Sequence, residues 1–366
     1  MLRKMVVRKS RPARLDNDPA SVDTGRTRVE ASRKGGMMIE ELLNGREWLL
    51  ADGATGTNLF EMGLAAGAAP ELWNADHPDR IRRLHQSFVE AGADIILTNS
   101  FGGNRRRLAM HGAGERAHAL NVLAARNARA VADAAGRRVV VAGSVGPTGE
   151  LLEPFGPLTE DEAVDVFAEQ IEALREGGAD LVWIETMSAL EEMRAAATAA
   201  ARVGMPCTVT ASFDTRGCTM MGVRPEAMIR TVGVFAPAPH GIGCNCGVGA
   251  SDLLCSVLAM TEAAPEAVVI AKANCGIPQA TDDGLTYSGT PALMAEYARL
   301  AVDAGARIVG GCCGTTPAHV LAMRRALEGH VRRERPDLAR IEQAIGPLVS
   351  PPAKPGAARR ANRGPA

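Results

Sequence analysis

Short apolar runs alternate with longer helical patterns along this chain, and the pair repeats eight times between residues 48 and 328. The runs are expected to be buried parallel strands, because they are apolar along most of their length. We place them at 48–52, 94–100, 138–145, 181–186, 207–213, 241–246, 268–274 and 307–312. Between them, apolar residues recur at helical spacing, as over residues 78–91. Eight strand–helix units in series predict an α/β fold, the (β/α)8 TIM barrel.

An open, doubly wound sheet is the alternative fold for this alternation. It is disfavoured because no Gly-x-Gly-x-x-Gly turn follows the first strand and because an even count of eight suits a closed barrel. The unusual polar and glycine-rich clusters follow the strands rather than precede them. In a (β/α)8 barrel the carboxyl ends of the strands carry the active site. We therefore expect the functional residues at that face.

Two segments outside the alternation are predicted to be tails. Residues 1–38 are rich in Arg and Lys without periodic hydrophobicity, which predicts a disordered basic tail. We interpret it as a solvated extension, or as sequence upstream of a start at Met37 or Met38. An organelle address or a nucleic-acid arm is the alternative. The barrel is expected over 39–330, and residues 331–366 as a helix remnant followed by a disordered tail.

Composition limits the kinds of binding partner and the cellular compartment that we expect for this chain. A formal net charge of -1 gives no reason to expect nucleic acid or a membrane surface as partner. The sequence has no apolar run near the roughly 18 residues of a membrane span, and its N-terminus lacks the apolar core of a secretory signal. Eight cysteines, two of them adjacent, do not form a disulfide framework in so long a chain. A reduced, cytoplasmic protein is therefore predicted.

Three cysteines stand at the ends of two expected strands. Cys246 ends one strand, and the adjacent pair Cys312 and Cys313 ends another. Barrel geometry brings these ends to one mouth, where three thiolates suit a tetrahedral zinc ion with an open fourth position. Buried core cysteines are the ordinary alternative, and Cys244 is interpreted in that way. A substrate thiol entering the open position would lose its proton beside the metal, which indicates thiol alkylation.

Seven stretches of the chain resemble the zinc-dependent homocysteine S-methyltransferase family. They are DGATGT at 52–57, TNSF at 98–101, GSVGP at 143–147, IET at 184–186, GCNCG at 243–247, KANCGIP at 272–278 and GGCCGTTP at 310–317. The family includes betaine–homocysteine methyltransferase and the homocysteine-binding module of cobalamin-dependent methionine synthase. The resemblance implies a zinc-dependent enzyme that methylates the thiol of homocysteine to form methionine.

The resemblance also implies which residues bind metal and substrate. The zinc ligands fall on Cys246, Cys312 and Cys313, with no further catalytic residue. Asp52 and Glu185 match acids that help hold the amino-acid head of homocysteine. Carboxylates at a barrel mouth can pair with an ammonium group, while backbone N–H groups take the carboxylate. The ordinary alternatives are a loop-capping turn residue for Asp52 and a surface ion pair for Glu185.

Further residues of the strand-end loops are expected to line the substrate site. Gly53 lets the loop after the first strand approach a ligand closely, and Asn274 does the same after the seventh. Asn99, with Phe101, is expected on the donor side. Asn and Gly also serve ordinary turns, which is the alternative for these loops.

The methyl donor stays open at this stage. A quaternary ammonium such as betaine is normally recognised by an aromatic cage, yet aromatic residues make up only 3% of the chain. Where the animal betaine enzymes carry tyrosines after strands two and four, this sequence has Gly102 and Thr186. Trp73 or Tyr287 could build a different cage. Betaine, S-methylmethionine and a methylated corrinoid on a separate protein all remain candidate donors.

Two other functions compete with this prediction. One is a different zinc TIM-barrel enzyme that uses zinc-bound water, which all-thiolate ligation without histidine disfavours. The other is a non-catalytic zinc-binding or corrinoid-docking module. The paired acids Asp52 and Glu185 argue against the second, because a docking module does not need to hold a substrate amino acid.

Overall fold

A computed structural model describes residues 39–352, apart from residues 277, 282 and 283. The expected basic tail over 1–38 lies outside the described residues, and so does the final stretch 353–366. Among the described residues, no helix is long and apolar enough to cross a membrane.

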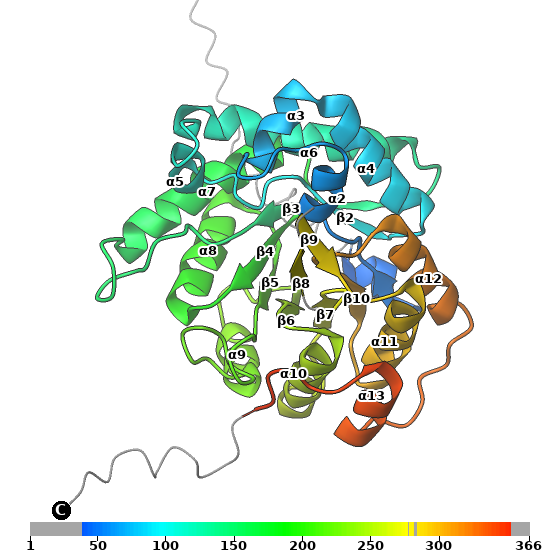
Figure 1. The fold of residues 1–366 in the computed structure, drawn as a ribbon. Helices are drawn as coiled ribbons and strands as arrows, with labels where there is room; N and C mark the ends of the chain where they lie inside the picture. Colours follow the sequence, from blue (N-terminus) through cyan, green and yellow to red (C-terminus); the bar gives the residue numbers. More distant parts are fainter. Residues whose placement is uncertain (1–38, 277, 282–283, 353–366) are drawn as a thin grey trace, which may run out of the picture.

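Eight parallel strands form the central sheet (Figure 1). They are β1 (Leu49–Leu50), β2 (Ile95–Leu97), β3 (Val140–Val145), β4 (Leu181–Met187), β5 (Cys207–Ala211), β6 (Gly241–Cys246), β7 (Val269–Ala273) and β10 (Ile308–Gly311). The order β1-β10-β7-β6-β5-β4-β3-β2 leaves β1 and β2 at the two ends. A parallel bridge between Ala51 and Ile95 brings those ends together. The sheet is thus a nearly closed, TIM-like barrel, and the predicted fold class is confirmed.

Helices surround the barrel (Figure 1). The main ones are α4 (Pro78–Glu90), α6 (Ala117–Ala134), α7 (Glu160–Glu176), α8 (Leu190–Val203), α9 (Pro225–Val232), α10 (Ala250–Ala263), α11 (Pro291–Asp303) and α12 (Pro317–Leu327). Shorter helices occupy the loops at α2 (Gly56–Glu61), η1 (Pro70–Leu72), α3 (Trp73–Asp76), α5 (Arg105–Ala109) and η2 (Gly114–Arg116). A capping box formed by Thr159 and Glu162 opens α7. Loop helices on the β1 and β2 side build one wall above the barrel mouth.

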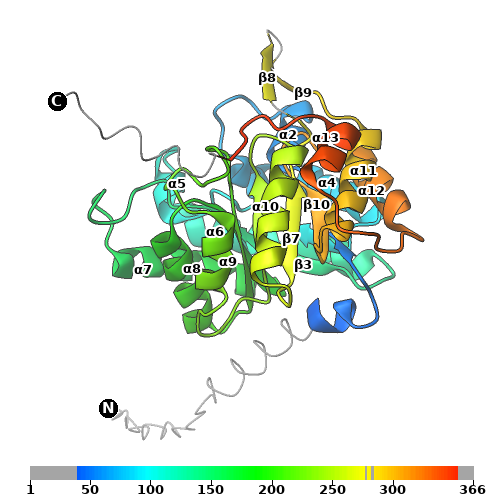
Figure 2. The ribbon, with the colours of Figure 1, turned by 90° about the horizontal axis from the view of Figure 1, so that it is seen from below.

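An antiparallel hairpin interrupts the seventh strand–helix connection, where the sequence analysis expected only a loop. Its strands are β8 (Pro278–Thr281) and β9 (Gly284–Tyr287). Figure 2 shows it projecting beyond the barrel on the side opposite the helical segment 39–43. At the base of the hairpin, the Gly289 N–H donates to the Cys275 carbonyl over 3.0 Å. The hairpin therefore stands beside the carboxyl ends of β7 and β10.

Two apolar layers position the strands. The barrel interior is filled by alternate strand residues and closed at its amino end by Ile39 and Leu43 from segment 39–43. A larger cluster fills the layer between strands and helices. The interior cluster has no member at the carboxyl end of β7, where Lys272 replaces the apolar residue expected by alternation. The functional site begins at that level.

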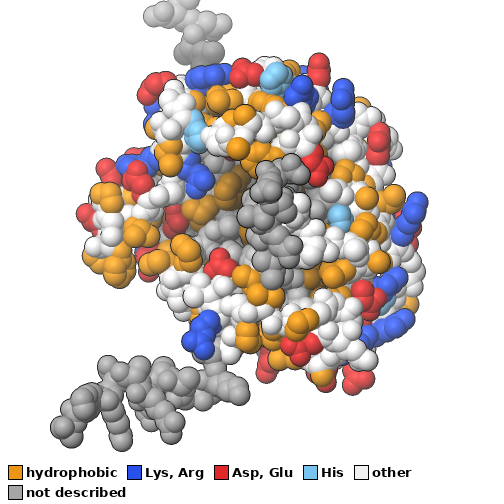
Figure 3. Space-filling model, viewed as in Figure 1, with side chains coloured by type: hydrophobic (Ala, Val, Ile, Leu, Met, Phe, Trp, Pro, Cys, Tyr) orange, Lys and Arg blue, Asp and Glu red, His pale blue; other side chains and the backbone are white. Residues whose placement is uncertain are grey.

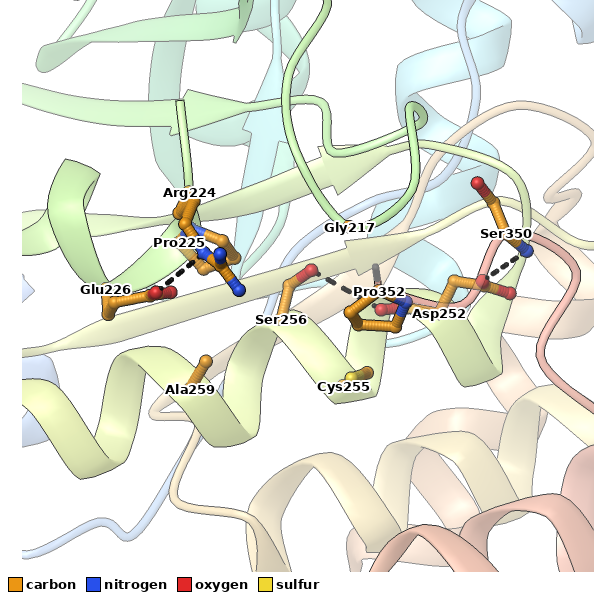
Figure 4. Close-up of a pocket in the computed structure, with 10 residues that line it drawn as sticks. All are labelled: Gly217, Arg224, Pro225, Glu226, Asp252, Cys255, Ser256, Ala259, Ser350 and Pro352. Carbon is orange, nitrogen blue, oxygen red and sulfur yellow. Dashed lines mark hydrogen bonds and ion pairs between the residues drawn. The ribbon is translucent and has the colours of Figure 1, made fainter. Parts of the chain in front are cut away.

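The C-terminal segment is tied to the outside of the barrel. It contains α13 (Leu338–Ile345) and then crosses the start of α10. Both carboxylate oxygens of Asp252 accept backbone N–H groups, from Val349 at 2.9 Å and Ser350 at 2.8 Å. A small pocket lies beside this contact, lined by Arg224 and Cys255 among others (Figure 4). It contains none of the predicted site residues.

Candidate metal centre and substrate cavity

The three predicted metal-binding cysteines lie together at the carboxyl ends of β6 and β10. The sulfur atoms of Cys246, Cys312 and Cys313 all lie within 4.8 Å of one another, and those of Cys246 and Cys313 are 4.0 Å apart. Cys246 has a φ of +63°, a left-handed conformation that side chains other than glycine rarely adopt. Backbone strain of this kind persists where surrounding contacts enforce it, and it clusters at functional sites.

Amide side chains support the sulfurs. Asn274 Nδ2 lies 3.5 Å from the Cys246 sulfur, and its Oδ1 accepts the Cys313 N–H at 3.0 Å. Asn245 Nδ2 lies 3.8 Å from the Cys312 sulfur. Hydrogen bonds from the Cys312 and Cys313 thiols, with that from Asn274, lower the pKa of the Cys246 thiol. Donors directed at sulfur stabilise the thiolate, which is the form that binds metal.

The sulfur spacing fits one metal ion. Metal–sulfur bonds of about 2.3 Å in a tetrahedron place sulfurs about 3.8 Å apart, close to the 4.0 Å between Cys246 and Cys313. Cys244, in contrast, packs between β6 and α10, with its sulfur 3.9 Å from the Leu253 carbonyl. His319 lies away from the three sulfurs and contacts the Cys275 sulfur at 3.2 Å. The three-cysteine cluster is therefore a candidate metal site.

A buried group of charges adjoins the cysteines. Lys272 Nζ donates to Asp52 Oδ1 at 2.8 Å, and the two side chains are 2% and 1% exposed. Asp52 Oδ2 accepts the Leu97 N–H at 2.7 Å. The ammonium of Lys272 also lies over the Trp183 ring, 5.4 Å from its centroid. Both oxygens of Asp52 thus have protein partners, so Asp52 is buried among protein groups and holds Lys272 in place.

Sequence reasoning missed Lys272, although a signal was present. It is the single charged residue in the run VIAKA of β7. In a barrel strand that is apolar on both faces, a charged residue has to find an opposite charge inside the protein. Asp52 of the first strand-end loop is that partner.

Glu185 reaches the cavity through an irregularity in β4. The pairing of β4 with β5 shifts between Ile184 and Met187, and Thr186 has a φ of +61°. Asn245 holds this bulge, because its Oδ1 accepts the Thr186 N–H at 2.9 Å while its Nδ2 donates to Thr186 Oγ1 at 2.7 Å. Bulges redirect side chains next to active sites. Here the Glu185 carboxylate accepts the Ser144 hydroxyl at 2.5 Å.

The ionisation of Glu185 is set by its burial. Burial raises its pKa to about 7, and this outweighs the nearby Lys272 ammonium, which acts in the opposite direction. Asp52 and Cys312 repel its negative charge and add to the rise. An acid with such a pKa changes its charge within the physiological pH range.

A cavity of about 500 Å3 opens above the cysteines and these charges. Gly53, Asn99 and Glu185 line it, together with Lys272 and all three cysteines. Figure 3 views this face, where hydrophobic side chains gather around a central hollow. Asp52 and Asn274 do not line the cavity. Asp52 contacts Lys272, and Asn274 contacts Cys246. Trp73 is buried outside the cavity, whereas Tyr287 lines it.

Asn99 has a supporting contact as well as a place in the cavity wall. Its Nδ2 donates to the Pro70 carbonyl at 2.8 Å and to Asn74 Oδ1 at 3.0 Å. It therefore joins the end of β2 to the loop that carries η1. Gly53 packs closely against the protein itself, because an added Cβ would lie 2.7 Å from the Thr315 carbonyl oxygen.

A protein-family model and a curated protein are similar in sequence to this chain. The family model described as "Homocysteine S-methyltransferase" matches residues 49–327. Methionine synthase of Mycobacterium tuberculosis is 31% identical over 306 residues, which cover 78% of this chain but only 25% of that protein. The chain therefore spans about a quarter of that relative.

Solved structures with a similar fold include the homocysteine methyltransferase MmuM from Escherichia coli. Its oxidized form shares 25% identity with this chain at a TM-score of 0.67, covering 78% of this chain and 98% of MmuM. The metallated form gives 24% identity and a TM-score of 0.66, with 78% and 99% covered.

Proposed function

The chain belongs to the homocysteine S-methyltransferase family, and from that premise we propose that it methylates the thiol of homocysteine to give methionine, with zinc held by Cys246, Cys312 and Cys313. The observation that supports this most is the meeting of the three sulfurs with a buried acid, Glu185, in one cavity. A thiol substrate with an ammonium group needs both features. When bound, zinc would keep the substrate thiol deprotonated at neutral pH.

The protein's own residues bind and orient the substrate in this proposal. Glu185 accepts the ammonium group of homocysteine, and Ser144 keeps its carboxylate in position. Lys272, fixed by Asp52, places its buried ammonium near Glu185, which lowers the cost of ionising that acid. Asn245 and Asn274 hold the sulfurs and the Glu185 bulge. Holding thiol and donor in one orientation supplies much of the rate enhancement.

The decisive experiment measures methionine formation by purified, zinc-loaded protein. Homocysteine is supplied with betaine, S-methylmethionine or a methylated corrinoid protein in separate reactions. We expect turnover with one of these donors and one zinc ion per chain. A protein that holds one zinc ion per chain yet forms no methionine with any of the three would contradict the proposal.

Homocysteine binding is expected to strengthen as the pH rises from 6 to 8. The ammonium group pairs with ionised Glu185, whose pKa of about 7 leaves it mostly neutral at pH 6. The KM for homocysteine should therefore fall several-fold over this range, at saturating donor and zinc. Glu185→Gln should have a high KM and lose this part of the pH dependence. An unchanged profile in that variant would assign the titration to another group, such as the substrate thiol.

A further inference from the structure

A second charged region lines the cavity away from the metal centre. It is formed by Glu71 of η1, Phe101 and Gly102 of the loop after β2, and Arg107 of α5. The predicted role of Asp52 and Glu185 does not involve these residues. Glu71 and Arg107 therefore lie on two short helices, and Phe101 and Gly102 lie on the loop between β2 and α5.

Arg107 lines the cavity with a guanidinium group that has no direct ion pair within the described residues. Its side chain makes no hydrogen bond or ion pair with the residues that the structure describes, although Arg105 and Arg106 of the same helix pair with Glu169 and Glu150. Its guanidinium carbon lies 5.6 Å from the centroid of the Phe101 ring. Stacking on an aromatic ring orients the planar fork, and that fork matches a carboxylate in two-point geometry.

Glu71 is the acidic side chain in the same region of the cavity as Arg107. It is 5% exposed, and its Oε1 accepts the Gly102 N–H at 2.7 Å. Burial raises its pKa, while the backbone hydrogen bonds and the charges of Arg107 and His111 act in the opposite direction. Within the described chain no cation lies within ion-pair distance of its carboxylate. A buried acid in a cavity wall attracts a positively charged ligand.

Gly102 separates these two side chains. A Cβ added there would lie 3.1 Å from Glu71 Oε1 and 3.4 Å from Arg107 Nε. The missing side chain therefore lets a carboxylate and a guanidinium occupy the same corner of the cavity. A larger residue at this position would displace one of them.

The two charged regions of the cavity have different neighbours. In the region with the sulfurs, Lys272 pairs with Asp52 and Glu185 accepts the Ser144 hydroxyl. Glu71 instead accepts the Gly102 N–H, in the corner that Arg107 shares. One region therefore adjoins the sulfurs, where homocysteine has to bind, and the other can hold a second charged molecule.

We propose that Arg107 and Glu71 bind the methyl donor, and that this donor is a small methyl onium compound carrying a carboxylate. The carboxylate pairs with the Arg107 guanidinium, while the onium centre faces the Glu71 carboxylate. The inference rests on the proposed function. A carbon–sulfur bond forms to the homocysteine thiolate, and the methyl–onium bond breaks. Its electron pair stays on the departing sulfur or nitrogen, which leaves as a neutral thioether or tertiary amine.

The test compares donors with and without a carboxylate. Zinc-loaded protein is assayed at saturating homocysteine with S-methylmethionine, betaine, and trimethylsulfonium as the carboxylate-free donor. Arg107→Ala is expected to raise the KM of the carboxylate-bearing donor at least tenfold. The kcat/KM of that donor, divided by the kcat/KM of trimethylsulfonium, should therefore fall toward one. Glu71→Gln should raise the KM of all onium donors. Arg107→Lys should restore part of the binding, and Arg106→Ala, on the same helix but outside the cavity, should match wild type.

Two further measurements separate this inference from the proposed function. Zinc content and calorimetric binding of homocysteine should be unchanged in Arg107→Ala, because the metal centre is elsewhere. Turnover with a methylated corrinoid protein alone would overturn the donor inference and leave homocysteine methylation standing. If no donor supports turnover, calorimetric titration of S-methylmethionine and betaine into the zinc–homocysteine complex still tests whether Arg107 contributes to donor binding. Equal binding by wild type and Arg107→Ala, or no binding by either, would overturn the inference.

Discussion

Replacing Cys312 with alanine is expected to remove zinc from the protein and to abolish methionine formation. Loss of a hydrogen bond behind a metal ligand costs roughly 10–100-fold in metal affinity or activity. Loss of one of three thiolates should cost more, so we expect activity to fall by at least about 10³-fold. The two remaining sulfurs, Cys246 and Cys313, stay 4.0 Å apart but leave two positions of a tetrahedron open. Zinc per chain, measured by elemental analysis after dialysis, is the primary readout.

Two variants act as controls for this loss. Cys244→Ala removes a thiol from the same strand as Cys246, yet its sulfur packs against α10, so zinc content should stay at one per chain. Asn274→Ala removes the amide beside Cys246 and should weaken zinc roughly 10–100-fold without removing a ligand. Full zinc occupancy in Cys312→Ala would show that the metal binds elsewhere.

The sequence predicted the strand ends closely because the signals there are local. The expected and observed bounds agree at β6 (Gly241–Cys246), and the strand expected over 307–312 differs from β10 (Ile308–Gly311) by one residue at each end. In each case glycine, proline or an apolar run marks the boundary. Since parallel strands of a barrel end at one face, the convergence of Cys246 with Cys312 and Cys313 could be anticipated from these bounds.

What could not be predicted depends on contacts between distant segments. The sequence of residues 278–287, which forms the β8–β9 hairpin, lacks the alternating pattern of a half-buried strand pair, so it predicts a loop. The bulge at Thr186 depends on the Asn245 side chain, 59 residues away. Arg107 and Glu71 share one corner of the cavity only because Gly102 leaves room between them. Asp52 was expected to contact substrate, and its pairing with Lys272, 220 residues away, could be identified only in the folded barrel.

The pairing of Lys272 with Asp52 predicts a large loss of stability in Lys272→Met. Methionine keeps most of the side-chain volume but removes the charge that neutralises a fully buried carboxylate. Breaking a buried ion pair by removing one partner costs about 3–5 kcal/mol, because the remaining charge is left uncompensated. We expect the melting temperature of the zinc-loaded protein to fall by on the order of 5–10 °C. Circular dichroism on heating would measure it.

A double variant separates the charge from the packing. Asp52→Asn in the Lys272→Met background removes the stranded carboxylate, and its Leu97 N–H contact can be kept by the amide oxygen. Much of the lost stability should therefore return, since replacing both partners of a buried pair is far less costly than replacing one. Homocysteine binding should not recover with it, because losing the Lys272 ammonium, which lowers the pKa of Glu185, outweighs losing the Asp52 charge, which raises that pKa to a smaller extent. The KM for homocysteine should then stay high at pH 7 and fall only at higher pH. Equal melting temperatures for the single and double variants would show that Lys272 stabilises the barrel by packing alone.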